Sequence, residues 1–96
     1  MTLPHREPDA RAVEAAILDL LSRRADDATV CPSEVARALA PDGQGWQPLM
    51  PLVRQVAQRL VQDGRLQVTR RGVPVDDATG RGGPVRLGRP RPPQED

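Results

Sequence analysis

The sequence contains no lysine, phenylalanine or tyrosine, and it has a single tryptophan, cysteine and histidine. Because a disulfide needs two cysteines, the lone Cys31 excludes a disulfide-stabilised domain. Cys31 and His5 together cannot supply the four ligands of a structural zinc site. The scarcity of aromatic rings disfavours proteins that stack single-stranded bases on aromatic side chains. We therefore predict a domain without cross-links, metal or cofactor.

Long apolar runs are missing as well. No stretch approaches the roughly 20 apolar residues that span a bilayer, and residues 1–9 lack the apolar core of a signal peptide. A length of 96 residues fits one small domain. We therefore predict a single cytoplasmic domain that has no membrane partner.

Arginine is abundant and unevenly placed. All 14 basic residues are arginine, and the net charge is only +1. Residues 1–46 hold 5 arginines and 8 acidic residues, whereas residues 47–96 hold 9 arginines and 5 acidic residues. A basic segment of this kind is typical of a surface that binds nucleic acid or another acidic partner.

Hydrophobic periodicity predicts three helices. The first covers about residues 10–24, with Asp9 as its N-cap and Arg23 and Arg24 in its last turn, where cations suit the helix dipole. The second begins at Pro32, and the third covers about residues 47–63 and stops at Gly64.

After Gly64 the apolar residues alternate, which predicts strands. Leu66 and Val68 mark one strand, a tight turn follows at residues 71–72, and residues 73–75 form an edge strand because they contain a proline. Short strands are expected at residues 29–30 and 85–87. The order of elements predicts an α+β winged helix, with a three-helix helix-turn-helix core and a C-terminal β-hairpin wing. A plain three-helix bundle with a disordered basic tail is the alternative.

This domain is expected over residues 9–88. A disordered N-terminal arm precedes it over residues 1–8, and a disordered Arg/Pro tail follows it over residues 89–96.

Several short stretches also resemble a known family. They are Cys31–Leu39, Trp46 with Pro48–Met50, Val53-Arg54, Asp63–Arg65, Val68-Thr69, Gly72 with Pro74–Asp76, and Pro84–Leu87. Spread over roughly residues 10–88, they are similar to small bacterial proteins catalogued as domain of unknown function 3253. The resemblance implies a winged-helix fold and no established activity. It also implies that Asp76 fixes the wing, by hydrogen bonding or by an ion pair with arginine.

The third predicted helix has one apolar and one polar face. At 100° per residue, its apolar residues cluster within about 60° of Val53. The opposite arc carries no acidic residue and consists of Arg54, Gln55, Gln58, Arg59 and Gln62. Arginine pairs with guanine edges and glutamine with adenine edges, and the second helix of a helix-turn-helix enters the major groove. A merely solvated helix face has the same composition, because both residues favour helices.

The predicted hairpin adds a second group of charges. Arg70 and Arg71 lie at its tip, where contacts to DNA phosphates are expected. A charged edge strand that prevents aggregation is the alternative. Arg65 lies at the base of the hairpin, and further arginines follow at positions 81, 86, 89 and 91. Those at 89 and 91 either add non-specific attraction to phosphate or keep the tail soluble.

Other conspicuous residues have simpler structural interpretations. Cys31 has no histidine nearby in sequence to activate it, so a structural role is expected. Trp46 is expected to pack over the loop between the second and third helices, and Asp76 and Asp77 to form a turn. The glycine-rich run at residues 80–83 lacks the lysine and the following helix of a phosphate-binding loop. No enzymatic activity is predicted.

Two functions remain open. The first is a double-stranded DNA-binding protein that places its third helix in the major groove and its wing on the backbone. The second is a winged-helix protein–protein interaction module whose basic face binds an acidic partner.

Overall fold

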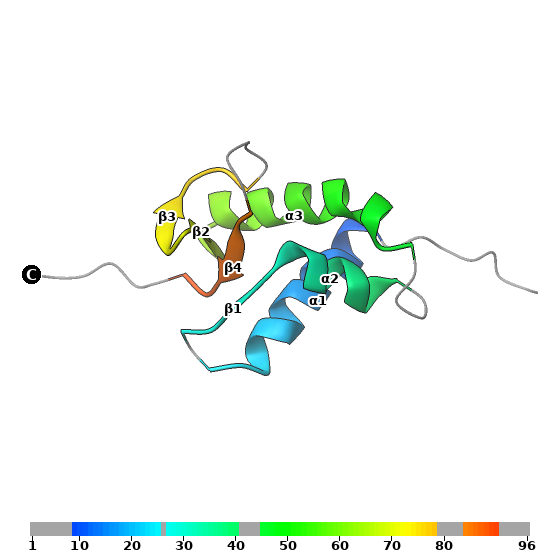
Figure 1. Ribbon diagram of the computed structural model, residues 1–96, viewed down its shortest axis with the longest axis horizontal. Coiled ribbons are helices and arrows are strands. Elements are labelled where there is room, and N and C mark those ends of the chain that lie inside the picture. Colours follow the sequence, from blue (N-terminus) through cyan, green and yellow to red (C-terminus); the bar gives the residue numbers. More distant parts are fainter. Residues whose placement is uncertain (1–8, 26, 41–44, 79–83, 91–96) are drawn as a thin grey trace, which may run out of the picture.

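The computed structural model describes residues 9–25, 27–40, 45–78 and 84–90 (Figure 1). It is an α+β structure of three helices and one four-stranded sheet, compatible with a winged-helix-like fold. The strands overturn the alternative of a plain helix bundle. The elements in chain order are α1 (Ala10–Ser22), β1 (Thr29–Val30), α2 (Pro32–Leu39), a 3-10 turn (Gln47–Leu49), α3 (Met50–Gln62), β2 (Gln67–Arg70), β3 (Val73–Val75) and β4 (Arg86–Gly88).

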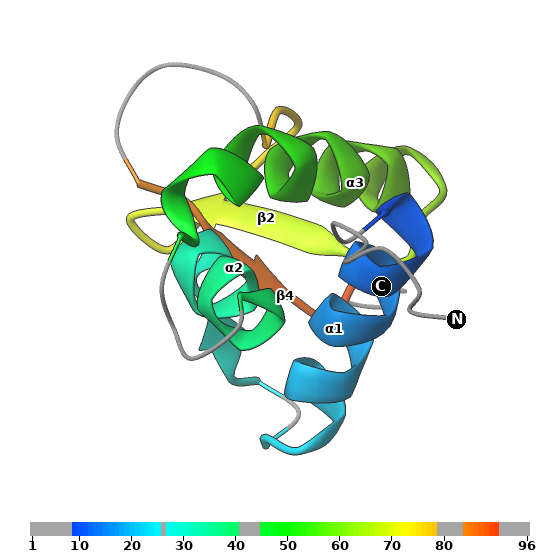
Figure 2. The same cartoon turned by 90° about the vertical axis from the view of Figure 1, so that its right-hand side faces the viewer.

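The sheet has the order β1-β4-β2-β3, and every pair is antiparallel. β4 therefore lies between the strand that precedes α2 and the strand that follows α3. It begins one residue later than the sequence predicts. β3 is an edge strand, as expected from Pro74, and pairs with β2 through a two-residue turn. The helices cover one face of the sheet, and α3 lies across β2 (Figure 2).

One apolar core joins the helices to the sheet. α1 contributes Val13 and Ile17, α3 contributes Val53 and Leu60, and β4 contributes Leu87, each with at most 2% of its surface exposed. These α1 and α3 residues recur at the three- and four-residue spacings from which the helices were predicted. The core holds α3 against the sheet with its opposite face toward solvent.

An ion pair ties the end of α1 to the start of α2. α1 ends at Ser22, two residues earlier than predicted, and Arg24 turns away from the helix axis toward α2. Its Nη2 lies 2.5 Å from Glu34 Oε2, and its Nη1 donates to the Thr29 carbonyl at 3.0 Å. The hydrogen bond from Arg24 is the main cause that lowers the pKa of Glu34 below its usual 4.5, against the opposing effect of burial. Arg24 is thus a tertiary contact, not the predicted partner of the helix dipole.

This pair predicts a pH-dependent stability. Because the folded-state pKa of Glu34 is lowered, its contribution is complete above pH 4.5 and is lost as the pH falls through the folded-state value. Glu34→Gln is expected to lower the free energy of unfolding by about 1 kcal/mol at neutral pH, since about a third of each side chain is exposed. Urea unfolding should show the difference shrinking below pH 4.5. Asp19→Asn, which breaks the more exposed pair with Arg23, is the control and should change little. An undiminished difference in acid would contradict the assignment.

Candidate nucleic-acid interface

α3 presents the polar face that the sequence predicts. Its apolar side is buried, whereas Arg54, Gln55, Arg59 and Gln62 are exposed and Gln58 is half-buried. Gly64, whose φ of 74° suits glycine, stops the helix just after Gln62 and the C-cap Asp63. There the Gly64 and Arg65 N–H groups donate to the carbonyls of Val61 and Leu60, at 3.0 and 2.8 Å. This stop ends α3 one residue earlier than predicted and directs the chain back beneath it as β2.

Gln58 has a different role from its neighbours. Its Nε2 donates to the Asp76 carbonyl at 3.0 Å, and its Oε1 accepts the N–H of Ala78 at 2.6 Å. Ala78 is only 3% exposed, so the segment after β3 is fixed against α3. Both polar ends of the Gln58 amide are occupied, so we correct its assignment from base contact to positioning residue. Asp76 thus takes part in fixing this segment by a hydrogen bond, through its carbonyl oxygen.

Gln58→Ala is expected to loosen this segment without unfolding the domain. The variant leaves the buried Ala78 N–H without a partner, which costs about 1–3 kcal/mol. Hydrogen exchange at Ala78 should accelerate, whereas exchange within β2 should change only as far as global stability falls. Gln62→Ala, at an exposed position of the same helix, is the matched control. Unchanged protection of the Ala78 N–H would show that the Gln58 hydrogen bonds do not hold this segment against α3.

The hairpin turn places two arginines at the edge of the molecule. Arg71 and Gly72 have φ values of 54° and 81°, the positive values that a tight two-residue hairpin turn requires. Arg71 is exposed, and Arg70 is half-buried opposite Val73. In Figure 1 the hairpin lies at the end of the molecule away from the first turn of α3, so the predicted tip and the start of the predicted helix face are not at the same end.

Most arginines outside these elements have internal partners. Arg65 Nη1 lies 2.5 Å from Glu14 Oε1, and Arg86 donates to the hydroxyl and carbonyl of Thr29 at 2.8 and 3.1 Å. Arg89 donates to the Leu21 carbonyl at 2.7 Å. Arg89 therefore belongs to the folded domain, and its assignment to a disordered tail is wrong. These three side chains stabilise the fold, so the basic second half of the sequence overstates the charge available to a ligand.

Three predicted segments lie wholly or partly outside the residues that the structure describes. The arm at residues 1–8, the glycine-rich run at 80–83, which includes Arg81, and the rest of the tail at 91–96 lie outside the described residues.

Five described arginines have no hydrogen-bond, ion-pair or ring partner within the described ranges. They are Arg11, Arg54, Arg59, Arg70 and Arg71. Four of them were predicted as site residues, and Arg11 was missed. It lies on α1, in the acidic half of the sequence, so composition gave no signal for it.

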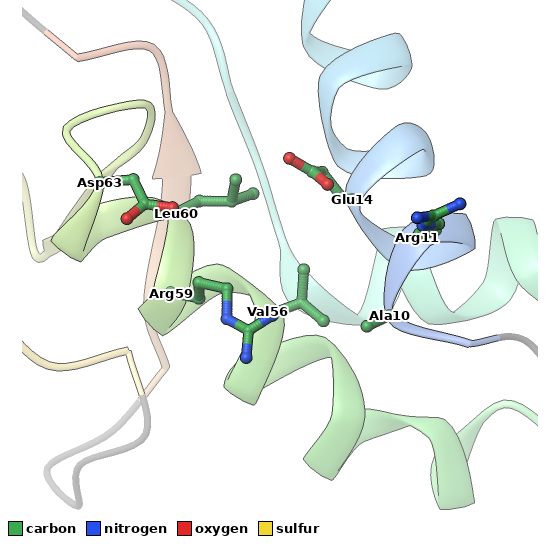
Figure 3. Close-up of a pocket in the computed structure, with 7 residues that line it drawn as sticks. All are labelled: Ala10, Arg11, Glu14, Val56, Arg59, Leu60 and Asp63. Carbon is green, nitrogen blue, oxygen red and sulfur yellow. The ribbon is translucent and has the colours of Figure 1, made fainter.

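Arg11 and Arg59 line opposite walls of a surface cavity of about 200 Å³ between α1 and α3 (Figure 3). Val56 and Leu60 contribute apolar side chains to it, and Glu14 and Asp63 carboxylates. The Glu14 carboxylate is bonded to Arg65, so part of the negative charge is already balanced. The basic surface of α3 thus continues to the first turn of α1.

The remaining conspicuous residues, Cys31 and Trp46, make contacts within the fold. Cys31 is half-buried, and its Sγ lies 3.0 Å from the Ser33 hydroxyl. The half-buried Trp46 packs against the core, and the Arg37 guanidinium lies 4.6 Å from its ring centroid. A packing role is thus confirmed, whereas residues 41–44 of the loop that it was predicted to cover lie outside the described residues. In the part of the chain that the structure describes, no group of three or more His, Cys, Asp or Glu side chains is placed to hold a metal ion. None of the helices described has the length and apolar character needed to span a membrane.

Comparison with family models gives a match over residues 10–90, to the family described as Protein of unknown function (DUF3253). The chain belongs to this family. The DUF3253 match begins at the first residue of α1 and ends just after Arg89, so it includes every helix and strand of the fold. The sequence-based resemblance is therefore confirmed, and the family description names no activity. No curated protein of similar sequence is found.

Proposed function

We propose that this DUF3253 protein binds double-stranded DNA, as a cytoplasmic, non-catalytic protein that places α3 in the major groove. One observation carries the proposal. The five described arginines without an internal partner lie on α3, at the β2–β3 turn and at the start of α1. Four of them are exposed and Arg70 is half-buried. Cations that contribute no internal contact are available to phosphates and base edges.

α3 has the dimensions and side chains for the groove. Its 13 residues extend over about 20 Å, and its exposed face offers Arg54, Gln55, Arg59 and Gln62 to base edges. The β2–β3 turn, with Arg70 and Arg71, is assigned to backbone phosphates. Asp76 is exposed beside Gln58 and repels phosphates. We therefore expect the DNA backbone to approach α3 from the side of Arg59 and Arg11.

Fluorescence anisotropy with a labelled random-sequence duplex at low salt tests this proposal. Saturable binding is expected, with weaker binding to a single strand of the same length, because few aromatic side chains are present to stack on bases. A protein that leaves the duplex unbound at low salt would contradict the proposed function.

The second candidate is a protein–protein interaction module with an acidic partner. The exposed edge of the sheet favours it, because Val73 on β3 is 62% exposed and edge strands can accept a partner strand. Affinity capture after nuclease treatment separates the two functions. A specific acidic protein partner that survives the treatment, together with absent duplex binding, would favour this module.

A further inference from the structure

The Arg70 side chain contains two buried donors that nothing in the described structure accepts. Its Nε and Nη2 atoms are shielded from solvent and have no hydrogen-bond partner among the described residues. In a guanidinium group these two N–H bonds point to the same side, and they form a planar fork that matches two oxygens of one phosphate or carboxylate. The unoccupied pair is therefore a complete recognition element for an oxyanion.

A buried guanidinium fork without an acceptor lowers the stability of a folded protein. Burying charged donors without an acceptor opposes folding, because the hydration that they lose is not replaced. The same fold satisfies a comparable side chain, since the half-buried Arg24 reaches both the Glu34 carboxylate and the Thr29 carbonyl. Asp76, six residues after Arg70, makes no such contact with it. The two unpaired Arg70 donors thus suit an acceptor from outside the domain.

The position of Arg70 suits such an acceptor. It is the last residue of β2, directly before the turn, and its cross-strand partner Val73 is 62% exposed. A ligand can engage the fork only when the Arg70 side chain rotates and brings Nε and Nη2 to the surface. A ligand that engages the fork gains both hydrogen bonds and removes the cost of leaving them unmade.

We propose that the Arg70 fork binds two oxygens of one backbone phosphate of duplex DNA. The inference rests on the proposed function and specifies how the hairpin contacts the backbone. It has a consequence that an ordinary surface arginine lacks: the side chain lowers the stability of the free domain while it strengthens binding. If Arg70 mainly stabilised the fold, its replacement would lower both the stability of the domain and its affinity for the duplex.

Two substitutions and two measurements test this inference on the full chain. Arg70→Met removes the charge, and it is expected to raise Tm by about 4 °C or more, to weaken duplex binding and to make the slope of log K against log salt shallower by about 0.9. Arg70→Lys retains a point charge without the fork. It should leave the slope unchanged and weaken binding about tenfold, in the range of one lost bidentate contact. Arg24→Met, which removes a satisfied guanidinium, is the control and should lower Tm.

The other possible results would overturn either the inference about Arg70 or the proposed function. If Arg70→Lys binds the duplex as tightly as the wild type, or if Arg70→Met lowers Tm, the inference is wrong and the proposed function stands. If the wild type binds no duplex, the proposed function fails and this inference fails with it. Binding of poly-glutamate that depends on Arg70, without duplex binding, would assign the fork to carboxylates and overturn the DNA assignment.

Discussion

Replacing Arg54 and Arg59 together by glutamate is expected to reduce duplex affinity by a factor on the order of 100 at low salt, because each change removes a cation and adds repulsion of phosphate. Both side chains are exposed and have no internal partner in the described structure, so the double variant should unfold at nearly the wild-type temperature. Anisotropy titration and thermal unfolding measure the two quantities separately.

The control for this experiment is Arg23→Glu. Arg23 is exposed after the end of α1 and is paired only with Asp19 on the same helix. One charge reversal there should have far less effect than Arg59→Glu alone, because it does not lie on the proposed interface. Equal losses for the two single variants would show that net charge governs binding, and that the α3 face has no special role.

Leu87→Ala is expected to produce the largest loss of stability. Leu87 is fully buried at the centre of the sheet, where β4 pairs with both β1 and β2. Removing a buried leucine side chain costs about 2–5 kcal/mol, a large fraction of the stability of a small domain. Thermal unfolding should show Tm falling by more than about 10 °C.

Val73→Ala is the matched control for Leu87→Ala. Val73 is also an apolar strand residue, but it is 62% exposed on the edge strand, so its loss should change Tm only slightly. A small effect of Leu87→Ala would contradict the central position of β4 and, with it, the sheet that supports α3.

The sequence predicted α3 and its outward face well, because both depend on local spacing. Apolar residues at helical intervals define the buried side, and the polar residues opposite them are consequently exposed. The hairpin could also be predicted from local sequence. The spacing of the apolar residues changes to two after Gly64, and Pro74 restricts residues 73–75 to an edge strand. The position of β4 was correct to within one residue, although its pairing with β1 and β2 depends on contacts between distant parts of the chain.

The sequence could not show which polar side chains have hydrogen-bond or ion-pair partners within the fold. Gln58 and Gln62 are indistinguishable on a helical wheel, yet only Gln58 meets the backbone of residues 76–78. Arg65 and Arg86 count as basic charge in the sequence, but their partners lie 51 and 57 residues away. Arg11 is the converse case, because a cavity between α1 and α3 is lined by both Arg11 and Arg59. Such pairings follow from tertiary packing and have no local signature.

The salt dependence of duplex binding tests the proposed DNA-binding surface most directly. Five arginine charges that each displace counterions from the duplex, whether they lie against phosphates or base edges, predict a slope of log K against log salt of about −4.5. Measured by anisotropy with one random-sequence duplex over a series of salt concentrations, a slope between about −4 and −5 is the expected result. A slope near zero, or no binding at the lowest salt concentration, would contradict the assignment of these arginines to DNA.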